Sequence, residues 1–264
     1  MLRNKVSVNG LLALLAGLFF IVAALPATPA QALTCQVSPD DIPINLFYNG
    51  ATLTVTGTSG PGDDLLVKIS STTGDVHLKY KGKASGLFWM KMGNMEFKNV
   101  PNVYMLYSTG SIETMVDAAG RTANVLGYDA LRAGSTMERT DGVEVEAKWF
   151  DEYLKFKKAE NLYNVQEGTI VRRHGETGDE YTLTVAWPFQ APPANYTVEV
   201  FAVRDGQVVD RASAPITVEQ AGVVKQLSGL AFNNPAVYGV LAVIIAMVAG
   251  FAVGAIFKKG GGSH

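Results

Sequence analysis

An uncharged apolar run near the C-terminus limits what this chain can fold into more than any other feature. From Pro235 to Phe257 the chain reads PAVYGVLAVIIAMVAGFAVGAIF. As a helix this run is ~35 Å long, enough to cross a ~30 Å hydrocarbon layer. The alternative, a buried core helix, rarely has every face apolar over such a length. We therefore predict a transmembrane helix over residues 235–257.

The residues after this run indicate its direction in the membrane. Lys258 and Lys259 follow at once, and short lysine-rich flanks stay on the cytoplasmic side. Residues 258–264 are then a cytoplasmic tail, and the chain ahead of the helix is an ectodomain outside the membrane. The predicted topology is type I.

Small residues form a stripe along the predicted membrane helix. Ala246, Gly250 and Gly254 recur every four residues, a spacing that lets another helix approach closely. The stripe suits either an integral membrane partner or self-association. Small residues are also common in membrane helices that have no such role.

The N-terminus has the pattern of a secretory signal peptide. Arg3 and Lys5 precede an uncharged stretch from Leu11 to Leu25, and the small-residue triplet Ala30-Gln31-Ala32 follows it. We expect a signal peptide over 1–32, cleaved after Ala32. An uncleaved anchor is the alternative, but fifteen apolar residues at ~1.5 Å each fall short of a ~30 Å layer. A lipid anchor on Cys35 fits poorly, because Ala32-Leu33-Thr34 precedes it.

Composition excludes several classes of protein. Residues 33–234 carry a formal charge of −6, whereas a nucleic-acid binder needs the opposite sign. Cys35 is the one cysteine of the chain, so an internal disulfide, a multi-cysteine zinc site and an iron–sulfur cluster are excluded. We expect no cofactor and no nucleic-acid partner.

Alternating polar and apolar residues predict a mainly β ectodomain. Short runs of this kind, separated by turn residues, lie in a first β segment, 33–109, and in a second, 166–220. Asp205-Gly206 between two of them is a strong hairpin signal. We predict an Ig-like β-sandwich, and the pattern leaves open whether the two segments form one sandwich or two.

A helical insertion separates the two β segments. Between residues 110 and 165 alternation gives way to a helical period, as in Val143, Ala147, Phe150 and Leu154. We expect two helices there. A juxtamembrane stalk, 221–234, joins the second β segment to the membrane helix, and its apolar residues are placed to rest on the membrane surface.

Residues with catalytic chemistry are sparse. His77 and His174 have no partner at metal-ligand spacing, and the ectodomain contains no HExxH, GxSxG, SxxK or Walker-type loop. The segment Gly60-Pro61-Gly62-Asp63-Asp64 offers too few oxygens for calcium and is typical of a turn between strands. Classical nucleophilic hydrolysis is therefore not expected.

The most pointed chemical signal is the group Met90, Met92 and Met95. Thioethers are soft ligands that suit copper(I), so these three are candidate metal ligands. Methionine also commonly fills gaps in a β-sandwich core, which is the structural alternative. Cys35 is either an inert, partly buried thiol or a free thiol able to form an intermolecular disulfide.

Several segments together resemble a known family. They are GTSGPGDDLLVKI, FWM, VPNVYMLYS, LGYDALR, NYTVEVFAVRDGQVV and the C-terminal apolar run. Over nearly the whole mature chain the sequence resembles a family of bacterial transmembrane proteins first grouped in alphaproteobacteria. The resemblance implies a membrane-anchored periplasmic protein without assigned activity, often encoded near sulfite-exporter-like permeases. It supplies no catalytic residues, and the methionines and Cys35 are not part of its pattern.

Three functions compete at this point. The first is a non-enzymatic accessory or binding protein on the outer face of the cytoplasmic membrane, with an integral membrane partner such as an anion permease. The second is a periplasmic copper(I)-handling protein that uses Met90, Met92 and Met95. The third is an enzyme of unrecognised type, because a fold can carry chemistry without a short motif.

Overall fold

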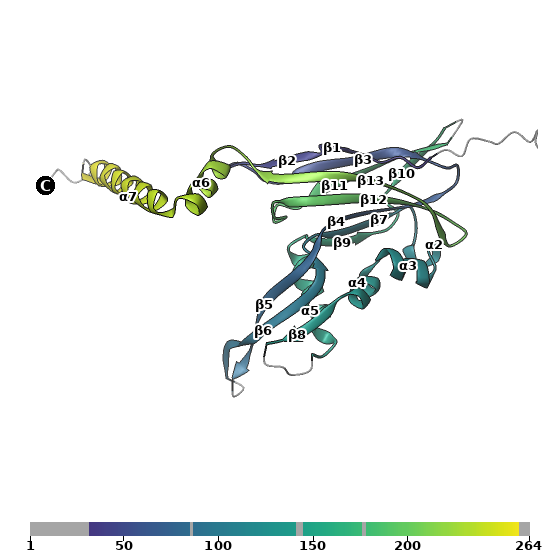
Figure 1. The fold of residues 1–264 in the computed structure, drawn as a ribbon, viewed down its shortest axis with the longest axis horizontal. Helices are drawn as coiled ribbons and strands as arrows, with labels where there is room; N and C mark the ends of the chain where they lie inside the picture. The colour runs from purple at the N-terminus through teal and green to yellow at the C-terminus, as the bar shows by residue number, and fades with distance from the viewer. Residues whose placement is uncertain (1–31, 85–86, 141–144, 176–177, 259–264) are drawn as a thin grey trace, which may run out of the picture. The chain divides into compact units, whose positions relative to one another are not determined.

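The computed structural model describes residues 32–84, 87–140, 145–175 and 178–258. The predicted signal peptide lies outside these residues apart from Ala32, and so does the tail after Lys258. The described chain forms three β-sheets and six helices. Figure 1 shows their arrangement.

Two of the sheets form a β-sandwich. The smaller is antiparallel, and its strands are, in spatial order, β1 (Gln36–Ser38), β3 (Ala51–Ser59), β11 (Asp179–Trp187) and β10 (Val171–His174). The larger has the order β2 (Asp41–Ile44), β13 (Gln207–Gln220), β12 (Ala194–Arg204), β4 (Asp64–Ser71), β7 (Tyr104–Ser108) and β9 (Tyr163–Gln166). In the larger sheet β2 runs parallel to β13 and β7 runs parallel to β9.

This strand order confirms the predicted Ig-like sandwich. An Ig domain pairs strands A, B, E and D in one sheet and G, F and C in the other, with further strands beside C in variable-type domains. Here β1, β3, β11 and β10 take the first set of positions, and β13, β12, β4 and β7 take the second. Each sheet takes strands from both β segments, so the chain builds one sandwich and not two.

A tyrosine corner supports the same assignment. Tyr196 lies at the start of β12, and its hydroxyl donates a hydrogen bond to the carbonyl of Pro192, four residues upstream. This contact recurs between the fifth and sixth strands of Ig domains. The ring of Tyr196 packs edge-on against Trp187, with ring centroids 4.8 Å apart.

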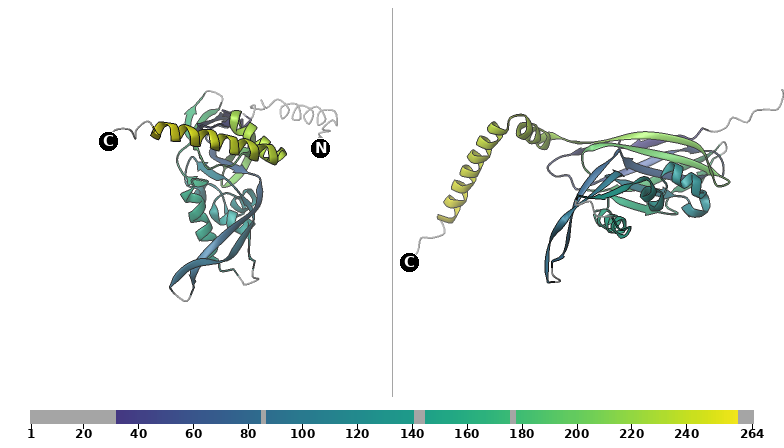
Figure 2. Two further views of the ribbon diagram at one scale, coloured as in Figure 1. Left: turned by 90° about the vertical axis from the view of Figure 1, so that its left-hand side faces the viewer. Right: turned by 60° about the horizontal axis from the view of Figure 1, so that its bottom comes forward.

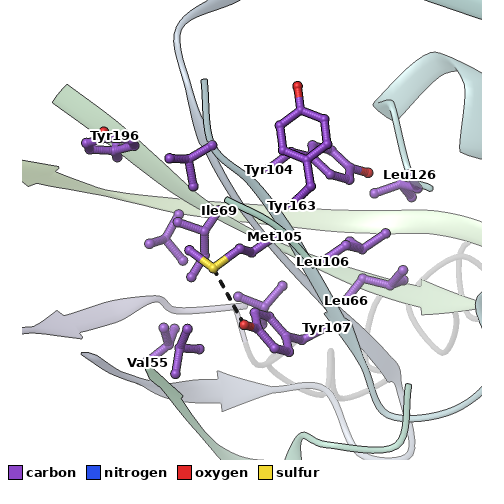
Figure 3. Packing of buried hydrophobic residues seen from close by; sticks show 14 of the residues in the cluster. Val55, Leu66, Ile69, Tyr104, Met105, Leu106, Tyr107, Leu126, Tyr163 and Tyr196 are labelled. Carbon is purple, nitrogen blue, oxygen red and sulfur yellow. Dashed lines mark hydrogen bonds between the residues drawn. The ribbon is translucent and has the colours of Figure 1, made fainter. Parts of the chain in front are cut away.

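Alternation along the strands explains the core. On β11, Tyr181, Leu183 and Val185 are buried, whereas the threonines between them are exposed, as expected for a strand with one face on the core. The central strand β4 is buried at consecutive positions from Leu65 to Ile69, so both of its faces are covered. Figure 3 shows the core around β4 and β7, where Tyr107 Oη donates to Met105 Sδ at 3.6 Å.

The predicted insertion contains more elements than the two expected helices. The described part of residues 110–166 holds four helices and the strands β8 (Thr136–Arg139) and β9. Val143 of the predicted helical stripe lies outside the described residues. The helices are α2 (Ile112–Met115), α3 (Ala118–Asn124), α4 (Tyr128–Gly134) and α5 (Lys148–Ala159). Asp117 caps the start of α3, Val125 ends it at φ 52°, and Gly127 precedes α4 at φ 104°. These local breaks divide a stretch whose apolar period reads as one helix.

The turn Gly60-Pro61-Gly62 connects β3 and β4 and is held by an ion pair. Arg204 donates to Asp63 Oδ1 through Nε at 2.8 Å and through Nη2 at 2.6 Å. Asp63 is buried, so this carboxylate is already engaged with a guanidinium. Asp205 and Gly206 both have positive φ, 52° and 82°, which confirms the predicted tight hairpin between β12 and β13.

Two helices complete the chain. The stalk is helical, α6 (Gly222–Asn233), and the apolar run is α7 (Pro235–Lys258). Pro235–Ala255 is 21 residues with a mean hydropathy of 2.5 and is long and apolar enough to span a membrane, as predicted. Asn234 alone separates the two helices, and its N–H donates to the carbonyl of Leu230 at 2.9 Å.

Candidate functional site

A long arm replaces the short connection between β4 and β7. It consists of β5 (Thr73–Ala84), β6 (Phe88–Pro101) and β8 (Thr136–Arg139), all antiparallel. At ~3.3 Å per residue, the twelve residues of β5 reach about 40 Å. Figures 1 and 2 show the arm extending away from the two large sheets.

The arm begins at the end of the sandwich from which the chain continues to α6. β4 ends at Ser71, opposite Tyr196 near the start of β12, and the start of β12 pairs with the end of β13. There the N–H of Ala221 donates to the carbonyl of Ile44 at 2.9 Å, directly before α6. We call this the α6 end; the hairpin at Asp205-Gly206 lies at the opposite end.

Aromatic packing fixes the base of the arm to α5. Phe97 on β6 stacks on Tyr153 of α5 with ring centroids 4.4 Å apart, and Tyr80 on β5 meets Trp149 edge-on at 5.1 Å. The hydroxyls of Tyr153 and Tyr163 lie 3.1 Å apart, and Tyr163 donates to the carbonyl of Pro101 at 2.6 Å. The base of the arm is therefore a packed, hydrogen-bonded joint.

The titratable groups of this joint are structural. Burial raises the pKa of Tyr153 to about 12, and it raises the pKa of Tyr163 further. Lys157 is buried beside both rings, 5.7 Å from each centroid, and its Nζ donates to the carbonyl of Asn102 at 3.2 Å. Burial lowers the pKa of Lys157. These groups stabilise the base through packing and hydrogen bonds, and Tyr153 and Tyr163 also border surface pockets.

Several pockets lie beside these elements, and one of about 380 Å³ is bordered by Tyr128, Lys158 and Tyr163. One of about 280 Å³, between the arm and α5, is lined by residues such as Met95, Phe97 and Trp149. Another, about 450 Å³, lies against α3 and α4. Two of its charged residues bind backbone: Arg121 donates to the carbonyl of Val116 at 2.8 Å, and Glu167 accepts from the N–H of Ile112 at 2.9 Å. In the chain that the structure describes, no three His, Cys, Asp or Glu side chains are placed to hold a metal ion.

The tip of the arm is apolar, basic and exposed. Leu87 is 76% exposed and Phe88 is 73% exposed. From His77 to Met95 the sequence has four lysines and no Asp or Glu. Exposed apolar residues together with charge of one sign mark an interaction surface. Strand and helix patterns do not predict this surface, although the run of lysines without acidic residues is its signal in the sequence.

The arm also carries the three methionines. Met90 and Met92 are half-exposed near the tip, whereas Met95 is buried beside Phe97. Met90 lies opposite Gly82, and the side chain of Met92 covers the position that a Cβ on Gly82 would take. Met95 thus joins the packed base, and Met90 and Met92 form the exposed pair.

The other candidate residues lie in the sandwich, except His77, which lies on the arm. His174 Nδ1 is 2.7 Å from Oδ1 of the buried Asp179. Burial acts to raise the pKa of Asp179, but the hydrogen bonds from His174 and from the N–H of Gly62 outweigh it and lower this pKa. Cys35 is half-buried, and burial raises the pKa of its thiol to about 11, which favours the inert thiol. His77 lies on β5, 3.8 Å from Glu96.

The predicted helix-packing stripe lies on α7. Ala246, Gly250 and Gly254 are exposed along this helix. A Cβ added at either glycine would meet no atom within 4 Å in the described chain. The stripe is thus accessible to a second helix.

Together these features define a class of protein: a β-rich domain of Ig-like topology with one C-terminal membrane helix. The family assignment agrees with that class. Residues 32–259 match the model of the family described as "Putative transmembrane protein (Alph_Pro_TM)", and the chain belongs to this family. No curated protein and no solved structure matches the chain.

Proposed function

We propose that this protein is a non-enzymatic accessory protein of the bacterial cytoplasmic membrane whose arm binds an integral membrane protein. The observation that carries the proposal is the exposed, lysine-flanked tip at Leu87 and Phe88. The arm begins at the α6 end, from which the chain also continues to the membrane helix. An arm that begins close to the membrane anchor suits a partner in the same membrane.

The partner that we propose is an anion permease of the sulfite-exporter-like class. This rests on the gene neighbourhood that the family resemblance implies. The basic arm suits an acidic patch at the outer face of such a permease, because complementary charge steers association. The exposed stripe at Gly250 and Gly254 offers a second contact within the bilayer.

Photo-crosslinking from the arm tests the proposal. A benzophenone amino acid is placed at Phe88, with Val209 near the opposite end of the sandwich as the matched exposed control. We expect a discrete protein adduct from position 88 only. Reversing charge with Lys79→Glu, Lys81→Glu and Lys91→Glu should weaken it. Equal adducts from both positions, or an adduct whose yield is unchanged by the charge reversal, would contradict the arm as the binding surface. Mass spectrometry of the adduct tests whether the partner is a permease.

Replacement of the stripe tests the second contact separately. Gly250→Leu with Gly254→Leu should reduce crosslinking of α7 to the partner, since leucine prevents close helix approach. Val248→Leu, on an exposed residue of the opposite face of the same helix, is the control. Unchanged crosslinking in the glycine variant would discard the stripe.

The proposed orientation places the ectodomain in the periplasm. Its support is the lysine pair directly after the apolar run, because such flanks stay in the cytoplasm. Protease added to intact spheroplasts should then degrade the ectodomain. An ectodomain that resists protease until the membrane is broken would refute this orientation.

Copper(I) handling is the second candidate. It is favoured by the exposure of Met90 and Met92, two thioethers near one point of the arm. Met90→Leu with Met92→Leu should weaken copper(I) binding by the full chain, whereas Met95→Leu at the buried base should change it less. Equal affinity of all variants and the wild type would rule copper out.

A further inference from the structure

Two loops at the α6 end expose large apolar side chains. The loop between β2 and β3 carries Leu46 and Phe47, and Phe47 is 89% exposed. The loop between β11 and β12 carries Phe189, which is also exposed and stacks on Tyr48 with ring centroids 6.1 Å apart. We call these four residues the aromatic rim.

The backbone holds the rim in this exposed arrangement. The side-chain oxygen of Asn45 accepts a hydrogen bond from the N–H of Phe47 at 2.9 Å. The backbone carbonyl of Asn45 accepts one from the N–H of Tyr48 at 3.1 Å. The second loop has a tight turn, in which the N–H of Ala191 donates to the carbonyl of Pro188 at 3.1 Å. Built turns of this kind present the apolar side chains outward.

The rim lies close in the chain to the membrane span. Ile44, two residues before Leu46, accepts the hydrogen bond from Ala221 that precedes α6. The twelve residues of α6 cover about 18 Å, after which α7 begins at Pro235. The rim is therefore held within a few tens of ångströms of the bilayer by the chain itself.

Charge indicates what covers the rim. Neither loop, 45–50 nor 188–193, contains a charged residue. The stalk helix between them and the span exposes Val223, Leu227 and Phe232. Apolar and aromatic side chains without charge suit the boundary between lipid headgroups and acyl chains.

We propose that the aromatic rim inserts into the outer interface of the bilayer that α7 spans and fixes the tilt of the ectodomain on it. Leu46, Phe47 and Phe189 enter the lipid, and the apolar residues of α6 continue the contact. The occupant is lipid. This contact is separate from the basic tip of the arm and does not depend on a protein partner.

Spin-label accessibility in nanodiscs tests this proposal. The full chain, in a Cys35→Ser background, is placed at one copy per nanodisc of uncharged phosphatidylcholine. Nitroxide labels are attached in Phe47→Cys, Phe189→Cys and, as the exposed control at the opposite end, Val209→Cys. Accessibility to apolar oxygen and to a water-soluble nickel chelate gives the depth of each label.

We expect the labels at 47 and 189 to lie about 5–10 Å below the headgroup level and the label at 209 to lie in water. Adding Leu46→Ser should shift the label at 189 towards water, and anionic lipid should leave its depth unchanged. Rim labels as aqueous as position 209 would overturn the proposal. Labels shielded from both reagents would also overturn it, because they indicate that protein covers the rim. A depth that changes with anionic lipid content would overturn it as well, because it assigns the contact to the lysines of the arm.

Discussion

Replacing Phe97 with alanine should show whether the arm and the sandwich unfold together. Phe97 is 2% exposed and stacks on Tyr153 at 4.4 Å, so Phe97→Ala removes a packed ring from the joint between β6 and α5. Such truncations cost about 3–5 kcal/mol. In an ectodomain of this size, that corresponds to a fall in Tm of roughly 6–20 °C.

Phe88 on the same strand is the matched control. Its ring is 73% exposed, and substitutions at such positions change stability by about 0.5 kcal/mol or less. Phe97→Ala and Phe88→Ala therefore remove the same side chain from one strand. The first lies in the packed base of the arm and the second at its exposed tip.

Thermal unfolding of the full chain in nanodiscs, followed by tryptophan fluorescence, measures both variants. Hydrogen exchange on β5 and β6 shows whether the arm opens before the sandwich. A Phe97→Ala protein whose Tm falls by no more than that of Phe88→Ala, without faster exchange on the arm, would refute the packed joint.

Three further predictions concern the sandwich. Tyr196→Phe removes the hydrogen bond to Pro192 and keeps the ring, so the loss should be about 1 kcal/mol in the same unfolding assay; an unchanged Tm would contradict the corner. The pKa of Asp179 is lower in the folded protein than the value of about 3.9 in the unfolded chain. Its carboxylate therefore stabilises the fold above pH ~3.9, and this stabilisation is lost as the pH falls through the folded pKa. Asp179→Asn should flatten the acid side of a curve of Tm against pH, and a curve with the wild-type slope would contradict this. The thiol of Cys35, with its pKa of about 11, should react with maleimide near neutral pH only after unfolding, and labelling at the rate of a free cysteine would show otherwise.

Much of the sandwich could be predicted because its signals are local. Strict alternation on β11, the Asp205-Gly206 hairpin and the uncharged run of α7 each depend on neighbouring residues alone. Pairing between distant strands has no such signal. The parallel pairing of β2 with β13 and the mixing of both β segments in each sheet therefore emerge only from the structure.

The arm was the main feature that local patterns could not supply. Residues 74–80 and 86–92 have strand patterns, and a strand pattern is the same for a strand inside a sandwich and for one that projects from it. For this reason the strand pattern was compatible with Met90 and Met92 in a sandwich core, whereas the structure shows both half-exposed on the arm. The number of helices in the insertion could not be predicted for a similar reason. Val125 ends a helix at φ 52°, a conformation that valine does not favour.

The parallel pairing of β2 with β13 has a mechanical consequence. Tension from the membrane would enter the sandwich at Gln220 and pull along β13, which is bonded to β2 on one side and β12 on the other. Ladder hydrogen bonds lie across the strands that they join, so this load shears many of them at once instead of peeling them in turn. We therefore expect the sandwich to withstand pulling from its anchor.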